Sequence, residues 1–252
     1  MLTIDQSLIR LHGRAPLDAA PPAAGAHAAY EPAATRTVYG TLLNYRGALA
    51  ALGDAVHQVP YKAPPRAPVL YLKPANTWVG HGAPIPVPAG IDELEMGASL
   101  AVVIGRTACR VGVADALDHV AGCTIANDVS VPHAELYRPS IRHKCRDGFL
   151  PIGPWVTARR LVSDPGALEL RVFVDGELRQ RATTAELIRP IAQLLADVTE
   201  FMTLMPGDVL LTGVPEGAPR ARAGQQVAIE IDGLGRLENA LVDEAELAGG
   251  AA

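Results

Sequence analysis

The sequence predicts an α+β protein built around a large, strand-rich mixed sheet with few helices. The chain has 24 glycines and 21 prolines among 252 residues, so many turns separate short elements. Hydrophobic residues make up 49% and aromatic residues only 4%, so the core must consist of Val, Leu, Ile and Ala. Apolar runs of strand length also recur without a regular βαβ alternation, which favours an α+β arrangement.

The chain divides into an arm, one domain and a tail. Residues 15–35 hold ten Ala and four Pro, and they carry too few large apolar side chains to anchor a core. We therefore expect an Ala- and Pro-rich arm at 1–36, a folded domain at 37–246 and a flexible tail at 247–252.

The predicted strands are apolar runs bounded by turn residues. An Asp-Gly turn at 175–176 predicts a hairpin, because these residues tolerate the positive φ angles of a tight turn. In chain order the predicted strands are 38–43, 69–72, 99–105, 122–128, 168–174, 177–180 and 209–212.

Three stretches have helical spacing of apolar residues. They are 45–55, 115–120 and, with the clearest pattern, 184–202. Residues 60–68 hold four prolines and are expected to form an extended loop.

Composition excludes several classes of protein. The net charge of −5 argues against a nucleic-acid partner, which requires clustered Lys and Arg. We expect no membrane association, because no apolar run reaches the roughly 18 to 20 residues that span a bilayer. The first residues show no secretory signal, and three cysteines form no disulfide or zinc pattern. A cytoplasmic protein with buried, reduced thiols that acts on a small molecule is therefore expected.

Four segments carry a family resemblance. They are Leu72-Lys73-Pro74-x-Asn76-Thr77; Leu100-Ala-Val-Val-Ile-Gly105; Gly122-x-Thr-Ile-Ala-Asn127-Asp128 with Tyr137-Arg138-Pro139, Lys144-x-Arg146-Asp147-Gly148-Phe149 and Pro151-x-Gly153-Pro154; and Pro206-Gly207-Asp208-Val-Leu-Leu-Thr212-Gly213. In this order they resemble the fumarylacetoacetate hydrolase family over most of residues 38–246. The resemblance implies the fold of that family's C-terminal domain.

Within the family, the likeness is greatest to the isomerase/decarboxylase branch of homoprotocatechuate (4-hydroxyphenylacetate) catabolism. Residues 61–65, 137–139 and 200–204 carry it. Some members of that branch fuse two such halves, and this chain resembles the first half. The resemblance implies a subunit that decarboxylates 5-carboxymethyl-2-oxo-hex-3-ene-1,7-dioate and isomerises 2-hydroxyhepta-2,4-diene-1,7-dioate.

This chemistry places negative charge on the oxygen next to the substrate carboxylate, and a chelated divalent cation stabilises that charge. The resemblance implies Mg2+, or Mn2+ or Ca2+, held by a Glu-x-Glu pair before the apolar strand and by the Asp of the Asn-Asp step. Asp128 is that Asp, but Gly97 and Ser99 stand at the Glu positions. The cation is therefore expected to bind weakly or not at all.

Glu93 and Glu95 have the Glu-x-Glu spacing four residues earlier. Along a strand this offset displaces them by roughly 13 Å. Two interpretations stay open: a loop folds back and brings them to the metal, or they are solvated acids.

The acid/base pair of the family is also absent. Relatives carry His-x-x-Glu on the short helix after Asn-Tyr, where this chain has Ala48 and Ala51. The first half of the fused enzyme looks similar in this respect, whereas the second half resembles the metal-bearing members.

A basic and polar wall remains. Lys144 and Arg138 are the predicted groups that hold a carboxylate or enolate oxygen, and Asp147 is predicted to orient Lys144. Thr212 and Tyr137 are predicted to bind the substrate. The alternative for each is a structural or surface role.

We therefore expect a subunit that acts on dicarboxylic 2-oxo acids and assembles with a metal-bearing paralogue or as a homo-oligomer. The alternatives are a non-catalytic structural partner of that paralogue, another hydrolase or decarboxylase of 2-oxo acids in the family, and a self-sufficient enzyme that uses Glu93 or Glu95.

Overall fold

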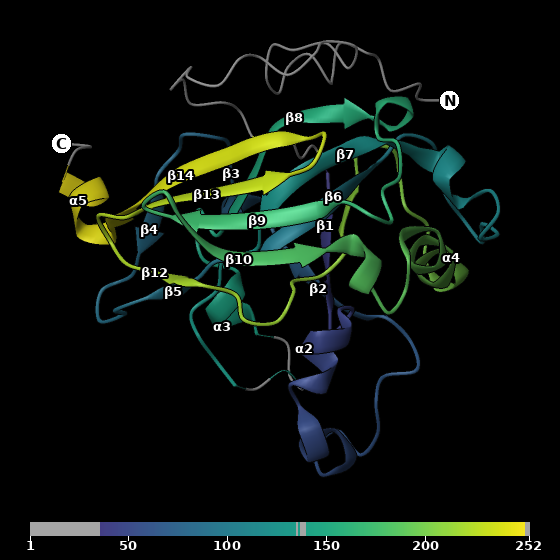
Figure 1. Cartoon of the computed structure of the whole chain (residues 1–252), viewed down its shortest axis with the longest axis horizontal. Coiled ribbons are helices and arrows are strands. Elements are labelled where there is room, and N and C mark those ends of the chain that lie inside the picture. Colours follow the sequence, from purple (N-terminus) through teal and green to yellow (C-terminus); the bar gives the residue numbers. More distant parts are fainter. Residues whose placement is uncertain (1–35, 135, 137–139, 250–252) are drawn as a thin grey trace.

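Two stacked sheets form the body of the molecule in the computed structural model, which describes residues 36–134, 136 and 140–249 (Figure 1). Strands of one sheet lie over those of the other. Contacts join β14 (Gly235–Asp243) to β8 (Leu150–Ala158) and β13 (Gln226–Ile231) to β7 (Val120–Asn127). The predicted arm at 1–36 falls almost entirely outside the described residues. The division into arm, domain and tail stays a prediction.

The larger sheet has seven strands and is mixed, with parallel pairs β1/β11 and β3/β8. Its order is β2 (Val69–Lys73), β1 (Val38–Leu42), β11 (Val209–Leu211), β6 (Ala98–Ile104), β7 (Val120–Asn127), β8 (Leu150–Ala158) and β3 (Trp78–Val79).

The second sheet has five strands, and a separate pair of strands lies beside it. The order is β10 (Glu177–Thr183), β9 (Glu169–Val174), β13 (Gln226–Ile231), β14 (Gly235–Asp243) and β4 (Ile85–Val87), and the pair is β12 (Arg220–Ala221) with β5 (Leu94–Glu95). The predicted strand-rich α+β fold with a large mixed sheet is confirmed.

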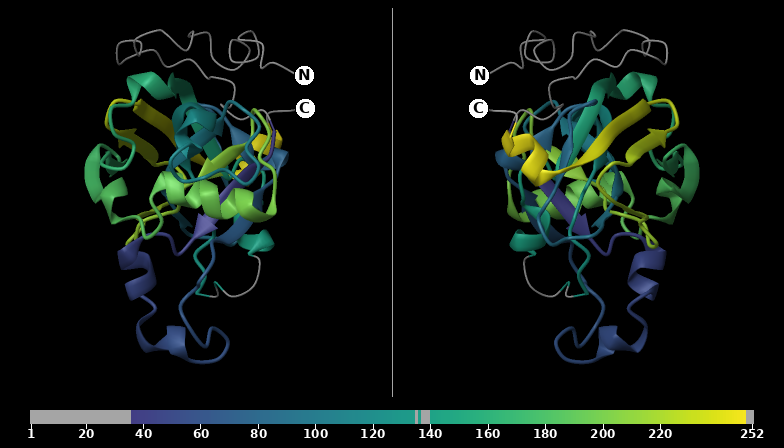
Figure 2. Two further views of the ribbon diagram at one scale, coloured as in Figure 1. Left: turned by 90° about the vertical axis from the view of Figure 1, so that its right-hand side faces the viewer. Right: turned by 90° about the vertical axis from the view of Figure 1, so that its left-hand side faces the viewer.

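The helices of the described residues are short. They are α2 (Arg46–Ala50), α3 (Ile141–Lys144), α4 (Ile191–Phe201) and α5 (Glu244–Gly249), with 3-10 turns at η1 (Gly53–His57), η2 (Ala75–Thr77), η3 (Ala116–His119), η4 (Arg159–Leu161) and η5 (Thr184–Glu186). Two side views show α2 and η1 projecting beyond the sheets (Figure 2). No helix of the described residues is long and apolar enough to cross a membrane.

The core is aliphatic, as the composition requires. Every residue of β6 is buried, because this strand lies inside the larger sheet with β11 and β7 as neighbours. Alternate side chains of β6 enter two clusters: Leu100, Val102 and Ile104 pack toward the main core, and Ala101 and Val103 pack on the opposite face. Successive side chains of a strand point to opposite faces of the sheet, and both faces are buried at β6, so this strand needs a continuous apolar run.

The predicted strands and the hairpin are confirmed to within a few residues at their ends. At the hairpin, Asp175 and Gly176 adopt φ of 51° and 80°, the pair of positive angles that a tight turn between twisted strands requires.

The predicted helix at 184–202 was wrong in its first half. Pro190 caps the start of α4, and the preceding segment holds only the 3-10 turn η5. A proline disfavours helical angles in the residue before it, so the chain is extended there instead. The predicted helix at 45–55 is shorter than expected, with α2 ending at Ala50 and the 3-10 turn η1 beginning at Gly53, whose φ is 49°. The stretch at 115–120 forms only the 3-10 turn η3.

The three cysteines differ in exposure. Cys123 is buried, Cys145 is half-buried and Cys109 is exposed, so the prediction of three buried thiols was wrong for Cys109. All three are free thiols, as predicted.

Candidate active site

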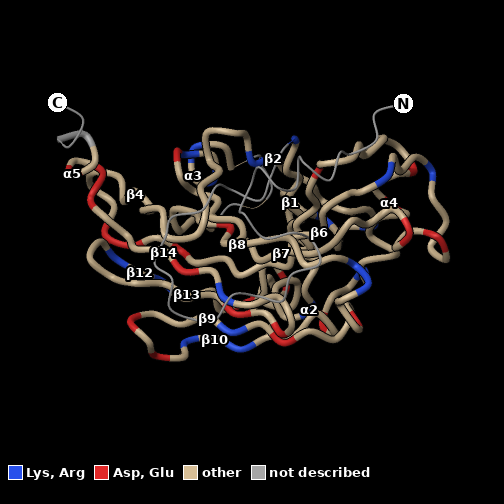
Figure 3. Tube along the Cα trace, turned by 90° about the horizontal axis from the view of Figure 1, so that it is seen from above, with Lys and Arg blue, Asp and Glu red and all other residues tan. Residues whose placement is uncertain are grey.

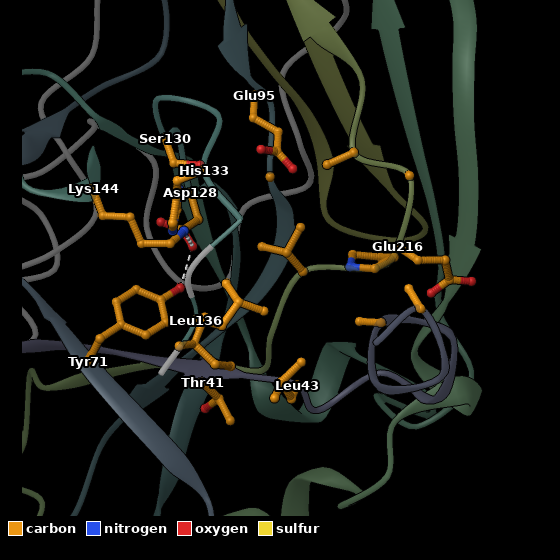
Figure 4. Close-up of a pocket in the computed structure, with 18 residues that line it drawn as sticks. Thr41, Leu43, Tyr71, Glu95, Asp128, Ser130, His133, Leu136, Lys144 and Glu216 are labelled. Carbon is orange, nitrogen blue, oxygen red and sulfur yellow. Dashed lines mark hydrogen bonds and ion pairs between the residues drawn. The ribbon is translucent and has the colours of Figure 1, made fainter. Parts of the chain in front are cut away.

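A cavity of about 220 Å³ lies where strand β7 ends and the chain turns into Asp128 (Figure 4). Its walls come from six parts of the chain: the β1–α2 segment, β2, the β5–β6 connection, the residues that follow β7, α3 and the loop after β11. Of the segments with the family resemblance, the third supplies Asp128 and Lys144 to this cavity, and the other lining residues lie outside the four segments.

Asp128 is the centre of a buried ion cluster. Its Oδ1 lies 2.9 Å from Nζ of Lys73, and its Oδ2 lies 2.8 Å from Nζ of Lys144. The hydroxyl of Tyr71 donates a hydrogen bond to the same Oδ2. Lys73 also donates to two backbone carbonyls, those of Val129 at 3.1 Å and Lys144 at 2.7 Å.

Local structure places these groups side by side. Tyr71 and Lys73 share one face of β2, because residues two apart in a strand point the same way. Lys144 is the last residue of α3. The side chain of Lys73 is fully buried, whereas that of Lys144 keeps 9% exposure and lines the cavity. Lys144 is therefore the ammonium group that a ligand can reach.

The charges of the cluster shift its pKa values. Burial alone would raise the pKa of Asp128, but the ammonium groups of Lys144 and Lys73 outweigh burial and hold that pKa well below its usual value. Burial lowers the pKa of Lys73 to about 8, against the opposing attraction of Asp128. Burial and the nearby carboxylate raise the pKa of Tyr71, which therefore stays a hydrogen-bond donor.

Two ammonium groups and one carboxylate form the Asp128 end of the cavity, and the carboxylate residues Glu95 and Glu216 line its other parts. Elsewhere basic and acidic residues are interspersed along the described chain (Figure 3). Among the described lining residues Lys144 carries the positive charge, and its ammonium group is the one suited to an anionic ligand.

Gly97 and Ser99 stand where the family resemblance places metal-binding carboxylates. A Cβ on Gly97 would lie 2.5 Å from the carbonyl oxygen of Asp128 and 2.9 Å from a methyl group of Val214. Ser99 is fully buried in β6. The close approach of the two backbones leaves no space for a side chain at position 97.

Glu95 and Glu93 lie in different surroundings. Glu95 lines the cavity, because its backbone pairs with Ser130 through hydrogen bonds of 2.8 and 3.2 Å. The carboxylate of Glu93 is held instead by Arg222, at 2.7 and 2.9 Å. Glu95 therefore lies at the cavity that Asp128 lines. Glu93 lies in an exposed ion pair instead.

The two alanines at the acid/base positions also face the cavity. Ala48 and Ala51 belong to or follow α2 and both line it. Glu216, from the loop after β11, lines the same end, and a Cβ on Gly47 would overlap its carboxylate. Sequence reasoning missed Glu216, although it directly continues the Thr212-Gly213 motif.

The remaining predicted site residues are dispersed. Arg138 and Tyr137 lie outside the described residues. Asp147 is exposed and accepts a hydrogen bond of 2.7 Å from Asn76, whereas Lys144 pairs with Asp128.

Thr212 is fully buried at the end of its strand. Its hydroxyl has no hydrogen-bond partner among the described residues, while its carbonyl accepts from Asn44 at 2.9 Å. Thr41, whose hydroxyl is also buried without a described partner, lines the cavity. The roles predicted for all these residues stay predictions.

The model of the fumarylacetoacetate (FAA) hydrolase C-terminal family matches residues 37–242. The chain belongs to the fumarylacetoacetate hydrolase family. A curated relative, the 4-hydroxyphenylacetate degradation bifunctional isomerase/decarboxylase of Escherichia coli, is 42% identical over 211 residues, which are 84% of this chain and 48% of the relative. The chain thus spans about half the length of this relative.

Solved structures of the family share the fold. The 5-carboxymethyl-2-hydroxymuconate delta-isomerase of Mycobacterium smegmatis matches with a TM-score of 0.71 and 35% identity, over 84% of this chain and 78% of that one. The fumarylpyruvate hydrolase of Pseudomonas aeruginosa, in complex with Mn2+ and pyruvate, matches with a TM-score of 0.71 and 28% identity, over 83% and 91% of the two chains.

The described residues do not form a site that fits such a cation. Asp128 already neutralises two ammonium groups, and no three His, Cys, Asp or Glu side chains of the described chain gather around a common point. Glu95 is the one carboxylate of the two predicted alternatives that lines the cavity. A hard divalent cation needs several oxygen ligands, and here both carboxylate oxygens of Asp128 are paired with ammonium groups.

Proposed function

We propose that this chain is a subunit of an isomerase/decarboxylase of dicarboxylic 2-oxo acids in 4-hydroxyphenylacetate catabolism. The observation that supports it best is the Lys144 ammonium, held at the cavity by Asp128 and Tyr71 in a chain of this family. A 2-oxo acid is anionic at its carboxylate and gains further negative charge on its carbonyl oxygen when it loses a proton or CO2.

Lys144 is the group that meets this charge. It is positioned from two sides, because its Nζ pairs with Asp128 and lies 5.1 Å from the centre of the Tyr71 ring. A preorganised ammonium in a partly dry site stabilises a developing enolate more than solvent does. Lys73 is fully buried and does not line the cavity, so its role is to fix Asp128.

A metal-bearing paralogue is the second part of the proposal. The position of Gly97 has no space for a carboxylate, and the acid/base positions on α2 are alanines. The curated relative is about twice as long as the match, which is the length that two such halves require. We therefore propose that Mg2+ or Mn2+ is bound by a paralogous subunit and that this chain contributes a carboxylate-binding wall.

The lack of space for a carboxylate at Gly97 and the alanines at the acid/base positions of α2 also support a rival function. In it the chain is a non-catalytic partner that only stabilises the paralogue. In that case the ion cluster around Asp128 serves folding, and Lys144 contributes nothing to turnover. The two proposals differ in what a change at Lys144 does to the assembled enzyme.

The test is reconstitution with a second member of the family that carries Glu-x-Glu before its apolar strand. The purified chain with Mg2+ or Mn2+ should turn over the dicarboxylic 2-oxo acid poorly, and the assembly should turn it over fully. Lys144→Met in this chain should lower turnover of the assembly by about 100-fold or more, because an electrostatic stabiliser of the enolate is lost.

Lys62→Met is the matched control, because Lys62 is exposed and does not line the cavity. Size-exclusion chromatography follows assembly in every variant. Full turnover by the pure chain would refute the need for a paralogue. An assembly that keeps its turnover with Lys144→Met would favour the structural partner.

A further inference from the structure

His133 lines the same cavity and carries a buried ring nitrogen without a hydrogen-bond partner among the described residues. It lies in the segment that follows β7 and lines the cavity with Ser130, Asp128 and Lys144. Its Nδ1 is 2.9 Å from the carbonyl oxygen of Val131. Its Nε2 is shielded from solvent and has no hydrogen-bond partner among the described residues.

The contact with Val131 fixes the tautomer of the neutral ring. A carbonyl oxygen only accepts hydrogen bonds, so Nδ1 carries the proton and donates it. Nε2 then holds the free lone pair, which is the arrangement of a histidine ready to accept a proton.

A second imidazole holds the ring in place. His143 stacks on His133 with ring centres 4.8 Å apart and planes 10° from parallel. The backbone joins the two segments as well, since the Val131 N–H donates to the carbonyl of His143 at 3.0 Å. This support gives the His133 ring one orientation beside the cavity.

We propose that His133 is the acid/base group that moves the substrate proton, through Nε2. The inference rests on the proposed function and names a catalytic residue for it. His133 takes the acid/base role, because the acid/base positions of α2 that line the cavity are Ala48 and Ala51. Figure 4 places His133 with Asp128 and Lys144 on one side of the cavity and Glu216 on the other, where its carboxylate lies over α2.

The proton step balances without a further reactant. Nε2 accepts the proton from the carbon next to the carbonyl group, the C–H electron pair forms the enolate double bond, and the oxygen gains a negative charge that Lys144 neutralises. Return of the same proton from Nε2 to the far carbon of the conjugated system gives the isomer. The charged groups that line the same cavity are Asp128, Lys144, Glu95 and Glu216.

The experiment combines NMR of the chain labelled with 15N-histidine and turnover of the assembly. Pyruvate serves as the probe ligand. In the free chain the His133 signals should report the Nδ1–H tautomer, and pyruvate should shift the Nε2 signal. His133→Asn keeps a donor near the position of Nδ1 but removes Nε2, so turnover should fall by about 10²- to 10⁴-fold. The affinity for pyruvate should stay within about twofold, because Lys144 is untouched.

His57→Asn is the control, since His57 lies at the end of the projecting turn η1 and is exposed. His133→Gln provides a second variant if His133→Asn does not fold. Pyruvate binding without a response of Nε2, or full turnover with His133→Asn, would overturn the role of His133 and leave the proposed function standing. Absence of both pyruvate binding and turnover in the wild-type assembly would overturn the proposed function and this role with it.

Discussion

At the scale of single residues, the ion pairs of Asp128 conflict with the metal-binding role that the family resemblance implies for it. A carboxylate that ligates a cation needs free lone pairs, whereas Asp128 lies between two ammonium groups and a phenol. Burial of two lysines is tolerated only while this carboxylate stays charged, because an uncompensated charge in a dry interior is costly. Asp128 is thus required for the fold regardless of any catalytic role.

Asp128→Asn should therefore destabilise the protein strongly. It removes the countercharge of Lys73, which has no exposed side-chain surface, and the expected loss is about 3–5 kcal/mol in the free energy of unfolding. Urea denaturation measures it. Glu177→Gln is the control, because it breaks the exposed pair with Arg179 and should cost less than about 1 kcal/mol. Equal stability of the two variants would show that the cluster does not carry the fold.

The Asp128 carboxylate also determines how the free energy of unfolding changes at low pH. The pKa of Asp128 is lower in the folded protein than its ordinary value of 3.8, so the unfolded chain binds the proton first as pH falls. Its contribution is fully present above that value and is lost as pH falls through the lower folded value. The stability difference between wild type and Asp128→Asn should therefore shrink below about pH 4. A difference that stays constant down to the acid transition would contradict this assignment.

At the scale of elements, local sequence rules predicted the strands well and the helices poorly. The continuous apolar run of β6 predicts a buried strand. The Asp175-Gly176 pair predicts a hairpin turn, because these residues tolerate positive φ. The apolar residues before Pro190 continue the helical spacing of α4, but Pro190 prevents the helix from extending into that segment. The spacing of apolar residues alone does not show this limit. The prediction failed because the effect of the proline on the backbone overrode the helical spacing of the apolar residues.

The turn from β5 into β6 depends on Gly97. Here the chain leaves its pairing with β12 and enters the large sheet, and the Asp128 N–H donates to the Gly97 carbonyl at 2.8 Å. The absence of a side chain lets the two backbones meet. Glycine at the position where the family resemblance implies a metal-binding glutamate is therefore required by the local packing.

Gly97→Ala should destabilise the chain by about 1–3 kcal/mol, because the new methyl group would meet the Asp128 carbonyl and Val214 at overlapping distances. Gly112→Ala is the matched control, since its Cβ would meet only a carboxylate oxygen of Asp115 at 3.8 Å. The midpoints of thermal and urea unfolding compare the two. If Gly97→Ala were as stable as Gly112→Ala, the backbone contact would not be tight.

At the scale of the whole molecule, the sequence predicted the family and the buried acid of the site, but not how the groups meet. Asp128 and Lys144 stand in motifs that any reader of the sequence can locate. The position of Glu95 beside the cavity and the tautomer of His133 depend on a bridge to Ser130 and on the Val131 carbonyl. Such contacts join segments that carry no common pattern, so spacing along the chain could not reveal them.

The charge of the cavity also determines how the isolated chain should respond to metal. Because Lys73 and Lys144 already balance Asp128, and Glu95 is the remaining acid of the predicted set at the cavity, the chain alone should take up little Mn2+. Electron paramagnetic resonance of free Mn2+ measures this directly. The signal should stay nearly unchanged on addition of the chain, and EDTA should leave its unfolding curve unaltered, whereas the assembly with the paralogue should bind Mn2+ and lose turnover in EDTA. Glu95→Gln should change none of these results. Uptake of Mn2+ by the chain alone that Glu95→Gln abolishes would instead identify a self-sufficient metal site and refute the division of labour between two subunits.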